Sequence, residues 1–386
     1  MIPQVLKQLT ENWSGLGISD EPPKMLSAVC QTFGFDKAAA LIYVDADLGS
    51  TADRGPALVA KLPRGSAPSR PRGDNVTSAD ERLDEQERLR AVYQRTPTEL
   101  RSTLPRPLGR LQAGGATVAL ESFLTGQPLN GTFRGQDLLA PRSLTENVVS
   151  VVDWLTEFQQ RVPVVQIPLD QHAEWLLAPI RRYQQSFDLD LAERNFLARL
   201  EAEVRSGSYQ SVKQLVSHGQ LGPENVLRDG TAIRVIDWEW ASLRGIPGTD
   251  LLRYLMLYLF RSRGLEQSVE AADAYVSAFG WIWWGDGAHR AFLQSVIGDY
   301  FKAFQLPPSF AGFALALMLI DEAVHKVTAL SDRIERGGYW YPLNGTPFEP
   351  YSRQVQQQLN RVLLRTLADG YESVSRLATE DRQFGY

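Results

Sequence analysis

The chain has 386 residues, of which 44% are hydrophobic and 22% charged, and its formal net charge at pH 7 is −5. These values are typical of a globular protein that is long enough for two lobes, each with its own core. The negative net charge gives no indication of a nucleic-acid partner, because nucleic-acid sites need a surplus of Lys and Arg.

The cysteine and histidine contents exclude two further kinds of site. Cys30 is the single cysteine, so no intrachain disulfide can form, and the four histidines are too dispersed for a zinc pattern.

The longest apolar runs, LLRYLMLYLF and FAGFALALMLI, fall short of the roughly 20 residues that cross a bilayer, so no membrane span is predicted. The N-terminus has no basic segment followed by an apolar core. A cytoplasmic location without a signal peptide is therefore expected.

The pattern along the chain predicts a small β-rich part followed by a larger helical part. Residues 1–35 are expected to form a helical lead-in that includes the segment KMLSAVCQTFG. Residues 36–125 read mainly as antiparallel strands around one helix, and residues 126–386 read mainly as helices interrupted by one hairpin. The predicted fold class is therefore α+β.

Two elements of the small part carry charged residues in informative places. The apolar strand PALVAKLPRG contains one cation, Lys61, although a single lysine is also common on exposed edge strands. In the following helix, RLDEQERLRAVYQ, the residues Glu85, Leu89 and Val92 share one face. Glu85 is therefore an acid on the apolar face of this helix, and Glu87 lies off that face as the near alternative.

The larger part begins with a helix, TENVVSVVDWLTEFQQRV, for which Thr145 is the predicted N-cap. Two further helices, AEWLLAPIRRYQQSFDL and LAERNFLARLEAEVRSG, are expected before residue 218. The segment NVLRDGTAIRVIDWEW then reads as strand, Asp-Gly turn and strand. Such a hairpin would bring Asn225 and Asp237 to neighbouring strand ends, where two oxygen ligands could hold Mg²⁺.

The most informative segments are HGQLGPEN (218–225) and IDWE (236–239), followed by Gly245, Pro247 and Asp250. They resemble the H-G-D-x-x-x-x-N, D-W/F-E and G-x-P-x-x-D-L motifs of the aminoglycoside phosphotransferase-like family. The resemblance implies a protein kinase-like bilobal fold. It also implies transfer of a phosphoryl group from ATP or GTP, with Mg²⁺, to a hydroxyl group of a small molecule.

The resemblance assigns roles to residues in the small part. Lys61 would grip the nucleotide phosphates, and Glu85 would orient Lys61. The strand ALESFLTG matches the linker between the family's lobes, so the backbone from Glu121 to Phe123 would hydrogen-bond the adenine.

The resemblance also assigns roles in the motif region. Asp237 would be the main Mg²⁺ ligand and Asn225 the second. His218 would belong to the catalytic loop, and Asp250 would brace that loop by accepting hydrogen bonds from its amides.

Several positions depart from the family pattern, and the most serious is Gln220. The family has an aspartate there, whereas an amide cannot take up a proton at neutral pH. Gly222 and Glu224 also replace a frequent His or Tyr and a frequent Gly, and Glu224 is the obvious substitute acid. The expected phosphate-covering loop near TFGFDKAAALIYV contains only Gly34, not a glycine-rich run.

Two functions of different classes remain open at this stage. The first is a small-molecule phosphotransferase that works through another base such as Glu224, or at a low rate. The second is a nucleotide-binding pseudokinase or scaffold without phosphotransfer, and nucleotidylation is a third, less favoured reading. The acceptor and the oligomeric state cannot be read from the sequence, although aromatic segments such as GGYWYPL favour a sugar-like or alkyl alcohol.

Overall fold

The chain is seen here in a computed structural model that describes residues 2–18, 23, 25–31, 39–46, 56–63, 85–133, 137–164, 166–265, 272–286, 288–335 and 349–378. The chain divides into two compact units. The first unit comprises Met1–Gln127 and Leu227–Ala241, and the second comprises Pro128–Val226 and Ser242–Tyr386.

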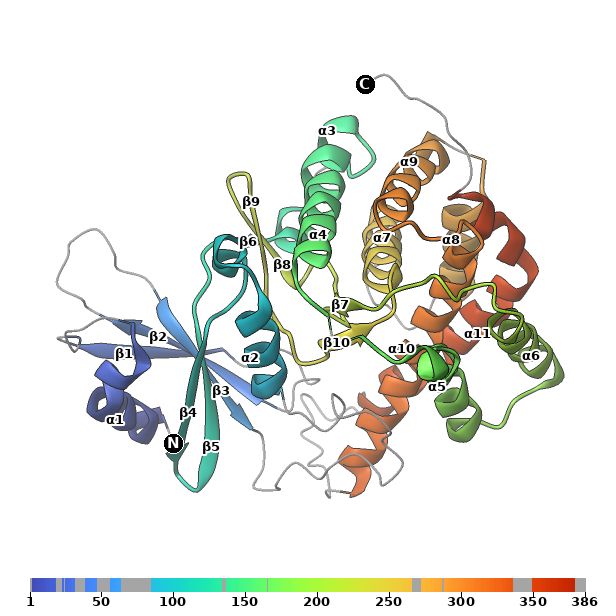
Figure 1. The fold of residues 1–386 in the computed structure, drawn as a ribbon. Helices are drawn as coiled ribbons and strands as arrows, with labels where there is room; N and C mark the ends of the chain where they lie inside the picture. Colours follow the sequence, from blue (N-terminus) through green and yellow to red (C-terminus); the bar gives the residue numbers. More distant parts are fainter. Residues whose placement is uncertain are drawn as a thin grey trace. The chain divides into compact units, whose positions relative to one another are not determined.

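The first unit is built on a five-stranded sheet whose neighbouring strands are all antiparallel (Figure 1). The strands lie in the order β1-β2-β3-β5-β4. Their bounds are β1 (Leu26–Gln31), β2 (Ala39–Ala46), β3 (Pro56–Pro63), β4 (Pro107–Ala113) and β5 (Ala116–Ser122). The register pairs Lys61 of the central strand β3 with Leu41 of β2 and Ala119 of β5.

The two faces of this sheet have different roles. Helix α1 (Ile2–Asn12) and the 3₁₀ turn η1 (Trp13–Leu16) contribute Val5, Leu9 and Trp13 to a core on one face. The strands contribute Val44, Leu58, Ala60, Leu111, Ala113, Val118 and Leu120. Because side chains alternate along a strand, Lys61 points to the other face, where it meets helix α2 (Glu85–Arg95).

The segment Leu26–Gln31 forms strand β1, so the prediction that the helical lead-in continues through these residues is wrong. The strand pairs with β2 from Leu26 opposite Ala46 to Gln31 opposite Leu41. Leu26 and Ala28 pack against the core of the sheet. Pairing with a neighbouring strand therefore outweighs the local helical pattern, which is a weak determinant by comparison.

A second small sheet contains the predicted hairpin. Strands β8 (Val226–Asp229) and β9 (Ala232–Val235) pair, and β6 (Gln127–Pro128) lies beside β8. Gly230 in the turn has φ 61°, a conformation that glycine adopts without strain. The short helix η3 (Thr98–Thr103) lies near β9. The structure thus groups residues 227–241 with the first unit, whereas the boundaries expected from the sequence group them with the helices.

The second unit is mainly helical, with one short antiparallel pair of strands, β7 (Leu215–Ser217) and β10 (Ser242–Gly245). Its α-helices are α3 (Pro141–Leu144), α4 (Ser150–Arg161), α5 (His172–Ser186), α6 (Leu191–Arg205), α7 (Thr249–Ser262), α8 (Ala272–Trp284), α9 (Ala288–Ala303), α10 (Phe310–Glu335) and α11 (Glu349–Arg376). Its short turns of helix are η4 (Leu129–Thr132), η5 (Thr145–Val149) and η6 (Leu169–Gln171). The predicted α+β class, with a small antiparallel β part and a larger helical part, is confirmed.

The helix predicted to begin after Thr145 begins earlier, at Pro141, so Thr145 is not an N-cap. Proline suits the first turn of a helix because its missing N–H has no partner there. The helix then continues through the π-helical turn η5 into α4. The apolar positions chosen from the spacing are all buried, namely Val148, Val151, Val152, Leu155 and Phe158.

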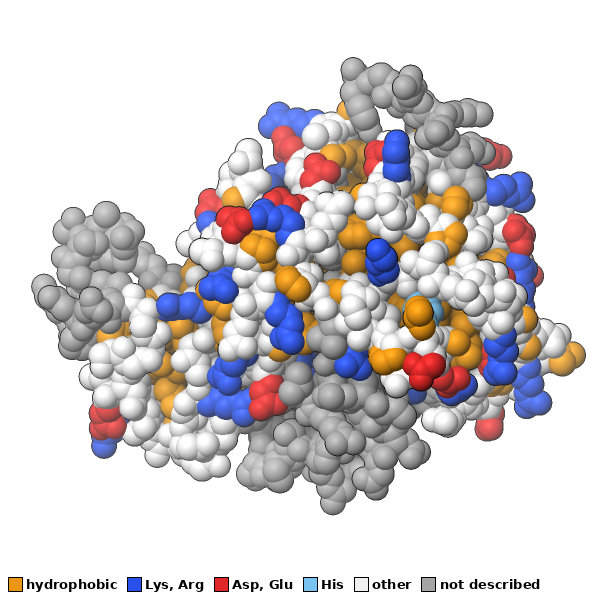
Figure 2. All heavy atoms as spheres, in the orientation of Figure 1, with side chains coloured by type: hydrophobic (Ala, Val, Ile, Leu, Met, Phe, Trp, Pro, Cys, Tyr) orange, Lys and Arg blue, Asp and Glu red, His pale blue; other side chains and the backbone are white. Residues whose placement is uncertain are grey.

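The described helices include none that is both long and apolar enough to cross a membrane. On the face drawn in Figure 2, Lys and Arg side chains are interspersed with Asp and Glu side chains. This mixture agrees with the small net charge of the chain.

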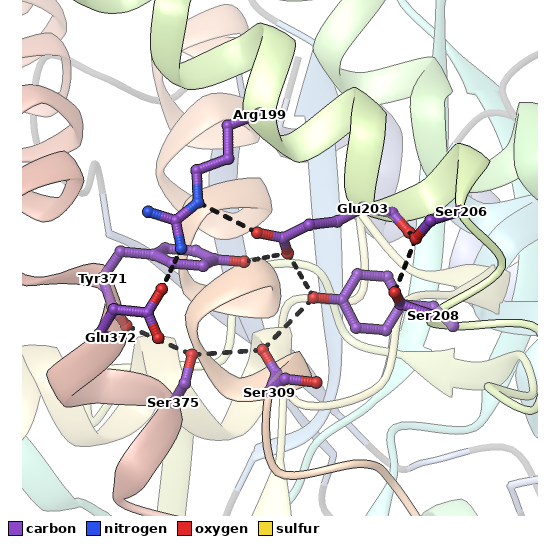
Figure 3. Close-up of polar contacts among 9 residues, drawn as sticks. Arg199, Glu203, Ser206, Ser208, Ser309, Tyr371, Glu372 and Ser375 are labelled. Carbon is purple, nitrogen blue, oxygen red and sulfur yellow. Dashed lines mark hydrogen bonds and ion pairs between the residues drawn. The ribbon is translucent and has the colours of Figure 1, made fainter.

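Two carboxylates, Glu203 and Glu193, anchor helix α11 in the second unit, and Figure 3 shows the contacts of Glu203. Glu203 of α6 accepts hydrogen bonds from the hydroxyls of Tyr209 (2.6 Å) and Tyr371 (2.7 Å). The guanidinium of Arg199 donates to the same carboxylate (3.2 Å) and lies 4.4 Å from the centre of the Tyr371 ring. One acid therefore joins α6, the segment after it and α11.

Glu193 makes a second anchor of the same kind. Its fully buried carboxylate accepts from the Tyr183 hydroxyl (2.8 Å) and from Arg361 of α11 (2.7 and 2.9 Å). It also completes a capping box with Asp190 at the start of α6. Burial alone would raise the pKa of Glu193, but the hydrogen bonds from Arg361, Tyr183 and the Asp190 backbone outweigh it and lower the pKa.

We predict that Glu193→Gln destabilises the protein by about 3 kcal/mol at pH 7, because Arg361 loses its buried partner. The folded pKa of Glu193 lies below its unfolded value, so its contribution is present above about pH 4.3 and is lost as the pH falls through the folded pKa. Thermal unfolding at several pH values should show the difference between variant and wild type shrinking in acid. Glu174→Gln, which breaks an exposed ion pair with Arg181, is the control with little expected effect. Equal melting temperatures for Glu193→Gln and wild type at pH 7 would contradict the prediction.

Candidate active site

Lys61 is the centre of a buried cluster of charges in the first unit. Its ammonium contacts the carboxylates of Glu85 on α2, of Glu121 on β5 (3.2 Å) and of Asp237 (3.9 Å). The Lys61 side chain is only 11% exposed. Glu87, the alternative acid on α2, lies instead 3.9 Å from Arg110. Three acids from three segments of the chain therefore meet at one cation.

The cluster holds more negative than positive charge. Burial alone would lower the pKa of Lys61, but Glu121, Glu85 and Asp237 raise it well above its usual value, so the ammonium stays charged. Burial raises the pKa of Glu121 to about 7, against the opposing attraction of Lys61. Burial and the nearby Asp237 and Glu85 likewise raise the pKa of Glu239 to about 7. The cluster thus contains one ammonium and four carboxyl groups, three of which contact the ammonium.

The segment after β9 is fixed by its backbone as well as by its charges. Asp237 adopts a left-handed conformation with φ 69°, which few residues other than glycine, asparagine and aspartate tolerate. Such conformations occur often at functional sites. Arg88 of α2 donates a hydrogen bond to the backbone carbonyl of Glu239. The helix that supplies Glu85 is therefore also tied to the segment that supplies Asp237.

The end of β5 lies beside this cluster. Glu121 is opposite Val59 in the sheet, and its side chain points to the same face as Lys61. The backbone N–H of Ser122 donates to Arg106 (2.9 Å) and that of Phe123 donates to Ala57 (3.2 Å). These two N–H groups are used inside the sheet, so a nucleobase would have to meet the neighbouring carbonyls or the N–H groups of later residues.

In the second unit, Asp250 holds the loop that begins at His218. Its carboxylate accepts hydrogen bonds from the backbone N–H groups of His218 (2.7 Å) and Gly219 (2.9 Å). Gly219 has φ 80°, where a side chain would be strained. Arg253, one turn further along α7, donates to the carbonyl of Leu221 (3.1 Å) and pairs with Glu322 of α10 (2.5 Å). Two charged side chains of one helix therefore fix the start of the loop.

Buried polar groups also brace the segments on either side of this loop. Gln159 of α4 donates to the carbonyl of Val216 (3.0 Å). Its side-chain oxygen accepts from the Tyr300 hydroxyl (2.6 Å), which in turn accepts from the N–H of Gly248 (3.2 Å). A chain of hydrogen bonds thus connects β7, which precedes the loop, with the start of α7.

Gly245 allows β10 to pair with β7. A Cβ atom at this position would lie 2.3 Å from the side chain of Ser217 and 3.0 Å from the carbonyl of Leu215. No side chain fits in that space. The close approach of β7, the strand that leads into His218, therefore explains why residue 245 is a glycine.

The remaining loop residues make specific contacts. The side-chain nitrogen of Asn225 donates to the carbonyl of Gln220 (3.0 Å), which leaves the side-chain oxygen as the atom able to bind a cation. Glu224 pairs with Arg261 of α7 (3.1 Å), and a Cβ at residue 222 would lie 2.5 Å from the Glu224 carboxylate. The Glu224 carboxylate therefore lies in the space that a side chain at residue 222 would enter.

Two expectations fall outside the described residues. They are the loop around Gly34 and the aromatic segment 337–348, which includes GGYWYPL. Within the part that the structure describes, no group of three or more His, Cys, Asp or Glu side chains is arranged to hold a metal ion alone. Mg²⁺ usually takes only one or two carboxylates and completes its shell with phosphates and water, so Asp237 still fits as such a ligand.

The sequence indicated some of these residues less clearly than others. Glu239 belongs to the quoted IDWE segment, but its proximity to Glu85 depends on the fold. Arg253 stood out as a charge within an apolar helix, and that was a usable signal for a buried partner. The pairing of Glu224 with Arg261 and the bond from Arg88 to Glu239 had no signal in the sequence.

Comparisons with known proteins identify a family whose model matches this chain. The family model described as "Phosphotransferase enzyme family" matches residues 51–292. A search of curated proteins found no match.

Among solved structures, the chain is similar to a choline kinase from Cryptosporidium parvum Iowa II, at 12% identity and a TM-score of 0.49 over 96% of this chain and 97% of that chain. It is similar to choline kinase LicA from Streptococcus pneumoniae at 12% identity and a TM-score of 0.45, over 93% and 98% of the two chains. A putative fructosamine-3-kinase from Thermobifida fusca YX-ER1 gives 15% identity and a TM-score of 0.44, over 94% and 98%.

We predict that Asp250→Ala lowers stability by about 2–5 kcal/mol, because two buried N–H groups lose a charged acceptor. Asp250→Asn should have an intermediate effect, since one amide oxygen remains to accept. Circular dichroism melts of the three proteins should rank them wild type, Asn variant, Ala variant. A stability-neutral Asp250→Ala variant would show that this carboxylate does not brace the loop.

Proposed function

The chain belongs to the phosphotransferase enzyme family, and we propose that it transfers the terminal phosphoryl group of ATP or GTP to a hydroxyl group of a small molecule. The observation that carries the proposal is the Lys61 cluster. A buried ammonium held by acids from a helix, a strand and the IDWE segment carries a desolvation cost that apolar side chains would avoid. Charged groups buried in this way are common at catalytic sites.

In this proposal Lys61 binds the nucleotide phosphates, and Glu85 orients its ammonium. The excess of carboxyl groups around Lys61 would repel phosphates, so the cluster calls for a divalent cation to accompany the nucleotide. Asp237, in the first unit, would be the main Mg²⁺ ligand. The side-chain oxygen of Asn225, in the second unit, would be the second ligand. When bound, Mg²⁺ would neutralise phosphate charge, and catalysis of phosphoryl transfer depends almost entirely on such electrostatic stabilisation together with positioning.

The loop from His218 to Asn225 would act on the acceptor. Its backbone is fixed at His218, Gly219 and Leu221 by Asp250 and Arg253. Phosphoryl transfer passes through a loose transition state and depends more on positioning than on a strong base. The acceptor is proposed to be a sugar-like or alkyl alcohol, as the aromatic composition of the C-terminal part suggests.

A nucleotide-binding pseudokinase is the second candidate, and one observation favours it. Gln220 cannot take up a proton, and the nearest acid, Glu224, is already paired with Arg261. The Glu224 carboxylate is therefore engaged in an ion pair and is not directed to a reactant by any contact in the structure. The same nucleotide site would then serve binding without transfer.

We predict that Asp237→Ala abolishes the thermal stabilisation that ATP or GTP gives in the presence of Mg²⁺, because the main metal ligand is lost. The variant should still fold, as judged by its circular dichroism spectrum. Asp273→Ala, at an acid in the first turn of α8, is the matched control. Unchanged stabilisation by the Mg-nucleotide in Asp237→Ala would show that the proposed metal site is wrong.

We also predict that Gln220→Asp raises phosphoryl transfer to alcohols by about tenfold or more, within the range of a positioned base. Radiolabelled ATP and GTP with a panel of alcohols would measure this. If Glu224 already serves as the base, Glu224→Gln should abolish transfer and Gln220→Asp should change little. A nucleotide-binding chain in which neither wild type nor Gln220→Asp transfers phosphate would instead establish the pseudokinase.

A further inference from the structure

Gln220 has a fixed backbone. Its N–H donates to the Nδ1 atom of His218 (3.2 Å), and its carbonyl accepts from the side chain of Asn225 (3.0 Å). The residues on both sides are held too, by Asp250 at Gly219 and by Arg253 at Leu221. The point from which the Gln220 side chain leaves the loop is therefore determined by buried charges of α7.

The side chain of Gln220 is only half-buried, and the hydrogen bonds that the described part of the chain makes to this residue all involve its backbone. Glu224, the acid in the same loop, is occupied differently, since its carboxylate folds against Gly222 and pairs with Arg261. Of these two side chains, the one without a hydrogen bond among the described residues is therefore the neutral carboxamide of Gln220.

A carboxamide differs from a carboxylate in a way that suits a reaction in which water receives the phosphoryl group. It accepts a hydrogen bond through Oε1 and donates through Nε2, whereas a carboxylate only accepts. A water molecule that attacks a phosphoryl group needs an acceptor for one of its O–H bonds, and the phosphoryl oxygens gain from a nearby donor. Glutamine side chains orient the attacking water in this manner in nucleotide-hydrolysing proteins.

We propose that this chain hydrolyses a nucleoside triphosphate, with the Gln220 carboxamide orienting the attacking water. The inference rests on the proposed nucleotide site, and it goes beyond transfer to an alcohol because water takes the place of the acceptor. Gln220 would touch the reacting water and is in that sense a catalytic residue, although it exchanges no proton.

The reaction balances without a protein base. The water oxygen forms a bond to the γ-phosphorus while the bond from that phosphorus to the β,γ-bridging oxygen breaks. The bridging oxygen keeps the electron pair and leaves with the nucleoside diphosphate. One proton of the water passes to a phosphoryl oxygen, so the products are the diphosphate and inorganic phosphate. In a loose transition state this proton is lost late, and orientation of the water matters more than its deprotonation.

The test is the release of inorganic phosphate from Mg-ATP and Mg-GTP by the full chain, in water labelled with ¹⁸O and without any alcohol. We expect one ¹⁸O atom in each phosphate released. Gln220→Leu should lower the rate at saturating nucleotide by at least about tenfold, since one positioned group contributes that much or more, while the Kd for the nucleotide stays unchanged. Gln184→Leu, the same substitution at an exposed position of α5, should keep the wild-type rate.

Equal rates for Gln220→Leu and wild type would overturn the inference, as would a wild-type rate no higher than that of the nucleotide in buffer. If the wild type phosphorylates an alcohol but releases no phosphate from water, the proposed function stands and this inference falls. If no Mg-nucleotide binds, both fall together.

Discussion

The buried ammonium of Lys61 and the acids around it are the constraint on which the first unit depends. A charge removed from water must be paired, and here Glu85, Glu121 and Asp237 supply partners from a helix, a strand and the segment after the hairpin. These contacts tie together segments that are far apart in the sequence. The acids outnumber the cation, and that imbalance is the physical reason for proposing a metal ion with the nucleotide.

In the second unit, buried polar side chains hold an irregular loop, which begins at His218, in one conformation. Backbone groups outside helices and sheets need partners when they are buried. Asp250 and Arg253 of α7 supply charged partners for the loop, and the hydrogen bonds from Gln159 through Tyr300 to Gly248 secure the segments next to it. Gln220, where the family resemblance implies an acid, lies in this braced loop.

The sequence predicted the elements that depend on local pattern and motif, and it failed where long-range pairing decides. The α+β class and the Asp-Gly hairpin came from periodicity and spacing, and the candidates Lys61 and Glu85 came from the family resemblance. Strand β1 was mistaken for helix because its structure depends on pairing with β2, which no local pattern reveals. The side-chain contact of Glu121 with Lys61 was missed for a similar reason, since it depends on the register of β3 and β5.

The most direct test of the account is the affinity of Lys61→Met for Mg-ATP and Mg-GTP, measured by isothermal titration beside the wild type. Methionine keeps the length of the side chain and removes its charge. The account predicts that the wild type binds at least one nucleotide in a Mg²⁺-dependent way and that Lys61→Met binds it at least about tenfold more weakly, a difference of about 1.4 kcal/mol. Lys7→Met, at an exposed lysine of α1, should bind as the wild type does. A folded Lys61→Met variant with wild-type affinity would contradict the central claim that this buried cluster is the nucleotide site.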